Sequence, residues 1–206
     1  MTADSVLQNA INTLAVPGVL IGYRMISTGD EQALMPQEQR AFATSVDKVR
    51  RASGAARIVA RRLMAQMGQL PQAVPKGASG APVWPEGLVG SLAHSSQVAV
   101  AALARRMDFS SLGIDVEAIE PLEADLLDLI ATPAERKAIA NGPCGGRLLF
   151  AIKEAIYKAV HPLDGVFLDH HDVEVNFVAG TAAVRGGRTV NFRHISSSHL
   201  VVLAFI

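Results

Sequence analysis

Hydrophobic positions along the chain recur with two different periods. Apolar residues spaced by three or four positions predict helices over residues 6–14, 37–67, 122–130 and 147–160. The helix 37–67 is expected to divide near residues 45–47. A further helix is predicted to begin at residue 133 and to end at a glycine-rich loop at residues 142–146. Shorter apolar runs predict strands over residues 19–26, 98–103, 112–117, 173–177, 181–184, 189–194 and 200–206. Proline and glycine are frequent in residues 70–90, which predicts a long loop, and loops of this length in a compact domain are often functional. Residues 162–165 predict a turn.

A weak internal similarity divides the chain into halves. Residues 95–101 and 197–203 both begin with Ser-Ser and continue into an apolar strand. Each segment stands at the end of one half of the chain. The pattern suggests two similar α+β halves with a site in the cleft between them, and a length of 206 residues permits either one domain or two small ones.

The charges of the chain cancel, with 19 basic and 19 acidic residues. No overall field favours nucleic acid or an anionic membrane, so an anion site must come from local clustering. The single cysteine, Cys144, excludes an intramolecular disulfide and a multi-cysteine zinc site. The N-terminal residues lack the basic region of a signal peptide, and no apolar run reaches the ~18 residues of a membrane span. These features predict a cytoplasmic protein without a membrane span.

Two acidic residues stand two positions apart in the predicted strand 112–117. Residues i and i+2 of a strand point to the same face, so Asp115 and Glu117 lie side by side, with Ile114 and Val116 facing the core. Adjacent like charges repel unless a cation lies between them, and paired carboxylates suit Mg²⁺. The alternative is an edge strand with an acidic, solvated outer face.

The predicted helix 147–160 carries a polar patch beside its apolar face. Lys153, Glu154, Tyr157 and Lys158 are contiguous because positions i, i+1, i+4 and i+5 meet on a helical surface. An ordinary solvated pair between Glu154 and Lys158 is the alternative reading.

Basic residues also cluster in the first half. Arg50, Arg57 and Arg61 fall at i, i+7 and i+11 and share one helical face, which is either solvated or a phosphate clamp. The small residues 53–56 allow another segment to approach this helix closely. Downstream, Lys76 lies in the long loop, and His94 is surrounded by serines and other small residues, so that a ring N–H aimed at a phosphate is plausible.

Four stretches together resemble motifs of the 4′-phosphopantetheinyl transferase superfamily. Residues 57–61 resemble its R-x-C-A-R helix, and residues 80–94 resemble its G-x-P-x-W-P and G-S-[IL]-[ST]-H elements. Residues 113–117 resemble its G-[IV]-D-x-E motif, and residues 150–159 its [FW]-[SC]-x-K-E-[AS]-x-[YF]-K-A motif. Each motif is permissive alone, but all four in this order are specific. The resemblance is greatest to the two-lobed monomeric group of the surfactin-synthetase activator and enterobactin-synthase component D type.

The chain departs from these motifs in three places. The basic run before the first helix motif keeps Lys48, Arg50 and Arg51 but lacks the usual Arg, Glu and Phe, and Val59 replaces a cysteine. Ala93 and Ala151 replace residues that bear a hydroxyl or thiol. These changes leave open which of the three basic residues contacts a nucleotide.

The resemblance implies an α+β fold of two similar lobes related by pseudo-twofold symmetry, each with a small antiparallel sheet packed on a long helix. The lobes are expected at residues 1–108 and 109–206, with the active site in the cleft between them. The implied activity moves the 4′-phosphopantetheine arm of coenzyme A to a serine of an apo carrier protein and releases 3′,5′-ADP. That chemistry depends mainly on positioning and electrostatics.

The resemblance also implies the roles of individual residues. Asp115, Glu117 and Glu154 are expected to hold Mg²⁺, with Mn²⁺ as the alternative cation, against the pyrophosphate. Lys153 and Lys158 are expected to neutralise phosphates, with Glu154 and Lys153 as catalytic residues and Glu154 as the first choice for the general base. The expected contacts of coenzyme A on the first lobe are Arg50, Arg57, Lys76, Ser91 and His94.

The expected partner is an acidic apo acyl or peptidyl carrier protein, docked by complementary charge, in secondary metabolism such as non-ribosomal peptide, polyketide or siderophore synthesis. Residues 122–130 are a candidate apolar contact with the carrier, although such a stretch more often packs in the core. A monomer is expected, with no nucleic acid bound. The alternative function is a catalytically silent module that binds coenzyme A or a nucleotide and retains the fold.

Overall fold

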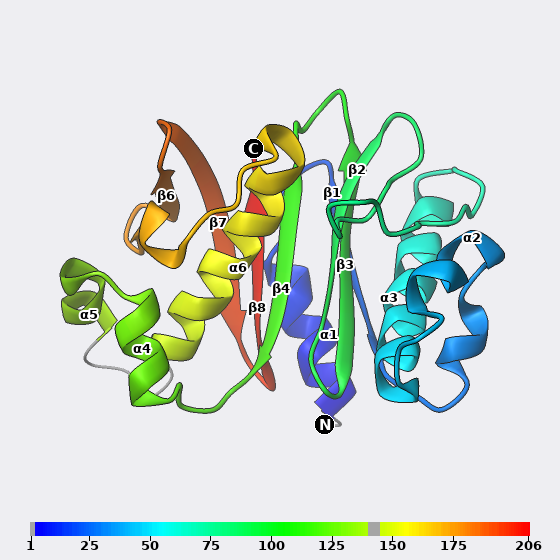
Figure 1. Ribbon diagram of the computed structural model, residues 1–206, viewed down its shortest axis with the longest axis horizontal. Coiled ribbons are helices and arrows are strands. Elements are labelled where there is room, and N and C mark those ends of the chain that lie inside the picture. The colour runs from blue at the N-terminus through cyan, green and yellow to red at the C-terminus, as the bar shows by residue number, and fades with distance from the viewer. Residues whose placement is uncertain (1–2, 140–144) are drawn as a thin grey trace.

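The computed structural model describes residues 3–139 and 145–206, so Cys144 and most of the predicted loop at 142–146 lie outside the described residues. Two antiparallel sheets stand next to each other, and a long helix packs on each (Figure 1). The mixed α+β architecture with two lobes, predicted from the sequence, is confirmed. Among the described helices, none has the length and apolar character required to cross a bilayer.

The first lobe contains a three-stranded sheet in the order β1-β3-β2. Its strands are β1 (Val19–Met25), β2 (Leu88–His94) and β3 (Val98–Arg105), and helix α3 (Asp47–Gln66) packs on one face. Central strand β3 is buried on both faces: Ala101 and Leu103 pack with α3, whereas Val100 and Ala102 belong to the core on the opposite face. Both faces are covered because β3 is apolar at nearly every position.

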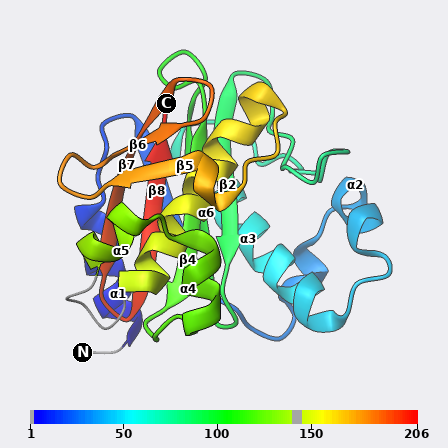
Figure 2. The ribbon, with the colours of Figure 1, turned by 60° about the vertical axis from the view of Figure 1, so that its left-hand side comes forward.

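The second lobe contains a five-stranded sheet in the order β4-β8-β7-β6-β5. Its strands are β4 (Leu112–Ala118), β5 (Val173–Asn176), β6 (Thr181–Val184), β7 (Arg188–Ser196) and β8 (His199–Phe205). Helix α6 (Gly145–Asp164) lies across one face, and the shorter helices α4 (Ala124–Ile130) and α5 (Pro133–Ile139) pack beside it. Figure 2 shows α4 and α5 far from α2 (Pro36–Gln39), which lies at the opposite end of the molecule.

The two lobes share a hydrophobic core. Helix α1 (Ala3–Thr13) contributes Leu7 and Ile11 to a buried cluster that contains Val100 of β3 and Ile114 of β4. Strands β2 and β4 lie side by side where the lobes meet (Figure 1). This shared core fixes the position of one lobe on the other. The boundary at residues 108 and 109 stays a prediction, although it falls between β3 and β4.

Several elements differ from the expectation. The predicted loop 70–90 ends early, because residues 88–94 form β2 and pair with β3 in a hairpin. The predicted turn at 162–165 is wrong, since α6 continues through Pro162 to Asp164. The predicted division of helix 37–67 is confirmed: a short α2 and a 3-10 turn (Arg40–Phe42) precede α3.

The predicted close approach to the small residues of α3 is also confirmed. The 3-10 helix η1 (Asp30–Ala33) crosses α3 at Gly54, where an added Cβ would lie 2.0 Å from the carbonyl oxygen of Asp30. A glycine is therefore required at this position by the packing of the two segments.

Candidate functional site

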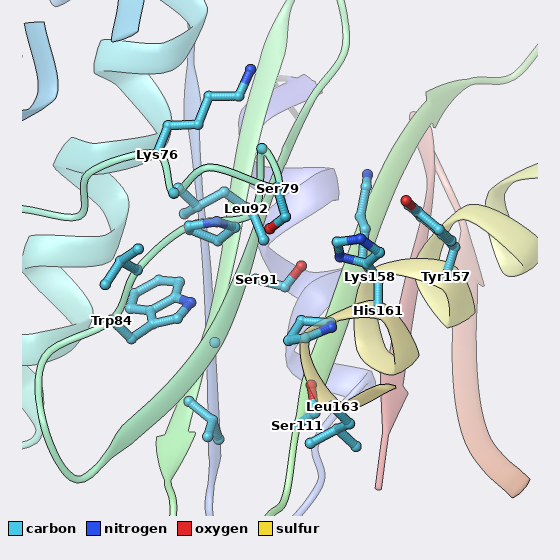
Figure 3. Close-up of a pocket in the computed structure, with 18 of the residues that line it drawn as sticks. Lys76, Ser79, Trp84, Ser91, Leu92, Ser111, Tyr157, Lys158, His161 and Leu163 are labelled. Carbon is cyan, nitrogen blue, oxygen red and sulfur yellow. The ribbon is translucent and has the colours of Figure 1, made fainter. Parts of the chain in front are cut away.

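A cleft of about 610 Å³ lies between the two lobes. One wall is formed by β2 and the loop before it, and the other by the second half of α6 (Figure 3). Ser91 and Lys76 come from the first lobe, while Tyr157, Lys158 and His161 come from α6 (Figure 3). Of the predicted site residues, this cleft brings together Lys76, Ser91, Glu154 and Lys158.

The predicted acidic pair lies on β4 and faces α6, not solvent. Asp115 is only 5% exposed, and its Oδ1 accepts a hydrogen bond from Lys158 Nζ at 2.6 Å. The second oxygen, Oδ2, is buried and has no hydrogen-bond partner among the described residues. Ile114 and Val116 are buried in the core on the opposite face of the strand, as predicted. The reading as a solvated outer face is therefore wrong.

Gly113 explains how α6 comes so close to β4. It lies on the same face of the strand as Asp115. A Cβ added at Gly113 would stand 1.8 Å from the carbonyl oxygen of Ala155 and 2.8 Å from the backbone nitrogen of Ala159. Both atoms belong to helix backbone and cannot rotate away. The absent side chain therefore allows the approach that places Lys158 on Asp115.

Glu117 and Glu154 share an electrostatic environment with Asp115. Burial raises the pKa of Glu117, and the negative charge of Asp115 raises it further, although Arg147 lies 3.5 Å away and opposes this. Burial also raises the pKa of Glu154; Lys158 opposes the shift and Asp115 adds to it. Each of the two glutamates thus experiences the charge of Asp115, and added positive charge would relieve the repulsion between the three carboxylates.

These residues fit a divalent cation. Within residues 3–139 and 145–206, no three Asp, Glu, His or Cys side chains are grouped tightly enough to form a complete metal site. Mg²⁺, however, usually takes only one or two protein carboxylates and completes its shell with water and ligand phosphate. The unpartnered Oδ2 of Asp115 is an oxygen donor of the kind that Mg²⁺ prefers.

A second cavity, of about 160 Å³, lies on the first lobe and contains three of the predicted basic residues. Arg57, Lys76 and His94 all line it, together with Phe42 and Ser53 among others. Burial lowers the pKa of His94, and the charge of Lys158 lowers it further whereas Asp115 opposes the shift. His94 therefore lies within electrostatic range of the Asp115–Lys158 pair, and Lys76 and Leu92 line both this cavity and the cleft.

Arg50 lies apart from the other predicted residues. Its guanidinium is 3.6 Å from Asp47 on the first turn of α3, its side chain is 43% exposed, and it lines none of the cavities described here. Its neighbour Arg51 is bound to Glu31 at 3.2 Å. The proposed contact between Arg50 and a nucleotide has no geometric support in this arrangement.

Lys153 does not project into the cleft as the sequence suggested. Its Nζ donates to the carbonyl oxygens of Ile130 and His170 and to Glu135 Oε2, each at 2.8 Å. An ammonium has three N–H donors, and all three are used within the protein. Its side chain is 1% exposed. The expectation that Lys153 neutralises a phosphate is therefore not supported by this geometry, whereas Lys158 on the next turn remains partly exposed.

Glu135 is a structural residue that the sequence revealed only in part. A capping box is present at the start of α5, because Thr132 and Glu135 exchange hydrogen bonds between side chains and backbone N–H groups. Glu135 additionally accepts from Lys153 and from the backbone N–H of Val175 at 2.9 Å. It thereby ties α5, α6 and β5 together.

A third cavity, of about 200 Å³, lies next to Lys153. It is lined by Glu154 and Tyr157, which also border the main cleft, and by residues 167–170. Sequence reasoning missed this segment. The apolar run Val166-Phe167-Leu168 directly after the glycine at 165 was the available signal.

Comparison with known proteins identifies the family of the chain. Residues 37–104 match the family model described as the 4′-phosphopantetheinyl transferase N-terminal domain, and residues 111–204 match the model of the 4′-phosphopantetheinyl transferase superfamily. The chain belongs to the 4′-phosphopantetheinyl transferase superfamily.

Several named members of the superfamily are similar to this chain. The 4′-phosphopantetheinyl transferase Npt of Nocardia iowensis is 41% identical over 145 residues, which cover 69% of this chain and 65% of Npt. The 4′-phosphopantetheinyl transferase Svp of Streptomyces mobaraensis is 37% identical over 160 residues, 74% of this chain and 65% of Svp. Enterobactin synthase component D of Escherichia coli K12 is 35% identical over 104 residues, 46% of this chain and 48% of that protein. The chain thus spans less than two thirds of the length of each of these relatives.

Proposed function

We propose that this superfamily member transfers the 4′-phosphopantetheine arm of coenzyme A to a serine of an apo carrier protein. The observation that carries the proposal is the Asp115–Lys158 pair, whose lysine lines the cleft between the lobes and whose Asp115 Oδ2 is buried without a hydrogen-bond partner among the described residues. A buried carboxylate that has one free oxygen and a neighbouring ammonium suits a phosphorylated ligand that arrives with a cation.

The reaction forms one bond and breaks one. The serine oxygen bonds to the phosphorus that bears the pantetheine arm, and the bond from that phosphorus to the bridging oxygen breaks, so that 3′,5′-ADP leaves. We assign to Glu154 the acceptance of the serine proton when it does not itself hold the cation, since a carboxylate bound to a cation is a poor base. Burial, which raises the pKa of Glu154, favours this role. Lys158, partly exposed at the cleft, neutralises charge on the phosphates.

The first lobe holds the nucleotide end of coenzyme A. Arg57, Lys76 and His94 surround the 160 Å³ cavity, and together they suit the 3′-phosphate. Ser91 in the main cleft provides a hydroxyl near the same ligand.

Of the predicted ligands, Asp115 together with Glu117 or Glu154, both within its electrostatic range, would hold Mg²⁺ or Mn²⁺. A bound cation of this kind supplies electrostatic stabilisation of the pyrophosphate oxygens. The charge of the cation would offset the repulsion from Asp115, which adds to burial in raising the pKa of Glu117 and of Glu154.

The carrier is an acyl or peptidyl carrier protein of secondary metabolism, and siderophore synthesis is one candidate because enterobactin synthase component D is among the relatives. We place the enzyme in the cytoplasm as a monomer. Light scattering of the purified protein tests the oligomeric state, and a panel of apo carriers identifies the pathway.

The direct test is incubation with coenzyme A, Mg²⁺ and an apo carrier, followed by the intact mass of the carrier. A mass gain of one phosphopantetheine arm, abolished when the acceptor serine of the carrier is replaced by alanine, is the expected result. Carriers of all three pathway types that stay unmodified, while the protein still binds coenzyme A, would establish the alternative of a catalytically silent binding module.

A further inference from the structure

Glu38 is completely buried in the first lobe, although it carries a charge and belongs to none of the motifs in the sequence. Its carboxylate accepts hydrogen bonds from the backbone N–H groups of Met35 and Val74, both at 2.7 Å. Arg61 Nη1 donates to both carboxylate oxygens, at 3.1 and 3.2 Å. A buried charge of this kind persists only when it is fully paired.

Val74 links Glu38 to Arg57 through its backbone. The backbone N–H of Val74 donates to Glu38, and the carbonyl of the same residue accepts from Arg57 Nε at 2.9 Å. Arg57 Nε also lies 3.6 Å from Glu38 Oε1. The Nη1 group of Arg57 donates to the carbonyl of Ser53, and the ring of Phe42 lies 4.9 Å from the guanidinium carbon. The guanidinium is thus held in one orientation.

This orientation leaves part of Arg57 available to a ligand. Within the described part of the chain, no group accepts a hydrogen bond from Arg57 Nη2, and Arg57 lines the 160 Å³ cavity. Burial lowers the pKa of Arg57; Glu38 opposes this shift and Arg61 adds to it. Glu38 therefore supplies the negative charge that keeps a buried cation next to the cavity.

The same carboxylate also holds the base of the loop that carries Lys76. Val74 is fully buried and bound to Glu38, and Lys76 follows two residues later. The backbone of Lys76 then pairs with Pro82 in an isolated bridge, and its side chain reaches the same cavity as Arg57. Two of the three basic residues at the cavity are therefore connected to Glu38 through Val74.

We propose that Glu38 is a positioning residue for recognition of the 3′-phosphate of coenzyme A, which it governs through Arg57 and the Lys76 loop without touching the ligand. The inference rests on the proposed function, because it takes coenzyme A as the ligand of the 160 Å³ cavity. Buried ion pairs can be replaced by apolar residues without loss of stability, so packing alone does not require a glutamate at position 38. The proposal gives Glu38 a role in ligand discrimination instead.

The test compares the binding of coenzyme A and of 3′-dephospho-coenzyme A by calorimetry, with no carrier present. The wild-type protein should bind coenzyme A more tightly than the analogue. Glu38→Gln keeps the shape of the side chain but removes its charge, so the affinity for coenzyme A should fall on the order of tenfold. The affinity for the dephospho analogue should not change, because that ligand has no group in the cavity.

Asp30→Asn is the matched control. Asp30 is the other buried carboxylate of the first lobe that is bound by an arginine, Arg24, and it lines none of the cavities described here. This variant should lower the melting temperature but keep the ratio of the two affinities. The double variant Glu38→Gln with Arg57→Gln should lose less discrimination than the two single variants combined, because part of the effect of Glu38 passes through Arg57; fully additive losses would contradict this coupling.

The outcomes separate the inference from the function beneath it. A wild-type protein that binds neither ligand contradicts the proposed function itself. If Glu38→Gln keeps the wild-type ratio of the two affinities, or loses affinity for both ligands equally, the role of Glu38 is overturned while the proposed function stands. If Glu38→Gln fails to fold, Glu38→Asp provides the test: it keeps the charge but withdraws the carboxylate, so discrimination should fall, and unchanged discrimination overturns the inference.

Discussion

Replacing Lys153 with methionine tests whether this lysine supports the second lobe or contacts the substrate. In the structure its ammonium is bound to Glu135 and to two carbonyl oxygens, and both partners of the ion pair are 1% exposed. Removing one partner of such a pair leaves the other charge buried and unpaired, which costs about 3–5 kcal/mol. Domains of this size have roughly 5–15 kcal/mol of total stability, so Lys153→Met should remove a large part of it.

The loss should be visible as a fall of roughly 10 °C in melting temperature, at about 2–4 °C per kcal/mol for a chain of this length. Urea unfolding followed by far-UV circular dichroism gives the corresponding free energy. Adding Glu135→Gln to Lys153→Met removes the uncompensated negative charge and should recover part of the lost stability. Alone, Glu135→Gln should destabilise the protein, since Lys153 then loses its counter-charge.

Lys158→Met is the matched control because it makes the same change on the next turn of the same helix. Lys158 is 29% exposed and lines the cleft, but it is also the hydrogen-bond partner of the buried Asp115. This variant should therefore lose some stability and should lose transfer to the carrier even under conditions in which it is fully folded. The reasoning fails if Lys153→Met retains wild-type stability while its transfer rate collapses in the same way as that of Lys158→Met. That result would mean that the ammonium of Lys153 acts on the substrate.

Three further predictions concern the site and the first lobe. Gly113→Ala should prevent close packing of α6 on β4, because its Cβ would lie 1.8 Å from the Ala155 carbonyl oxygen; a soluble protein with the wild-type melting temperature would contradict this. Asp115→Asn should lower transfer at least about a hundredfold with little change in melting temperature, which steady-state kinetics and calorimetry can check. Burial pushes the pKa of Asp30 up, but hydrogen bonds from Arg24 and a backbone N–H outweigh it and keep the pKa below its ordinary value. The stabilisation from Asp30 is therefore present above the unfolded pKa of about 3.9 and is lost as the pH falls through the lower folded pKa. In urea titrations, the advantage of the wild type over Asp30→Asn should shrink below about pH 5.

Local patterns were sufficient to predict most elements, and the failures have physical causes. The alternation around Asp115 predicted a strand with the correct buried face, because period-two patterning follows directly from the pleat. Strand β2 was missed because Gly90 and the small residues around it carry little strand propensity. Its glycine is explained only by tertiary packing: a Cβ there would lie 2.7 Å from the ring of Trp84.

The orientation of Lys153 shows where sequence reasoning about a site stops. Contiguity with Glu154 and Lys158 on the helix surface suggested a common function. Lys153 also lies four residues after Leu149 and three before Ile156, both fully buried, so its spacing equally matched the apolar stripe. Only the contacts with Ile130, Glu135 and His170, which are distant in sequence, decide between the two readings.

In both lobes, a buried ion pair holds the wall of a cavity next to the main cleft. Each cavity beside the main cleft has a buried cation in its wall, Arg57 in the first lobe and Lys153 in the second. Each cation is paired with a buried carboxylate on a short helix, Glu38 and Glu135, and that carboxylate also binds the backbone N–H of a distant segment. A loop bound in this way cannot shift without exposing an unpaired charge, which is strongly unfavourable. The buried ion pairs therefore fix the walls of the cleft, while Lys158, which lines the cleft, remains partly exposed to a ligand.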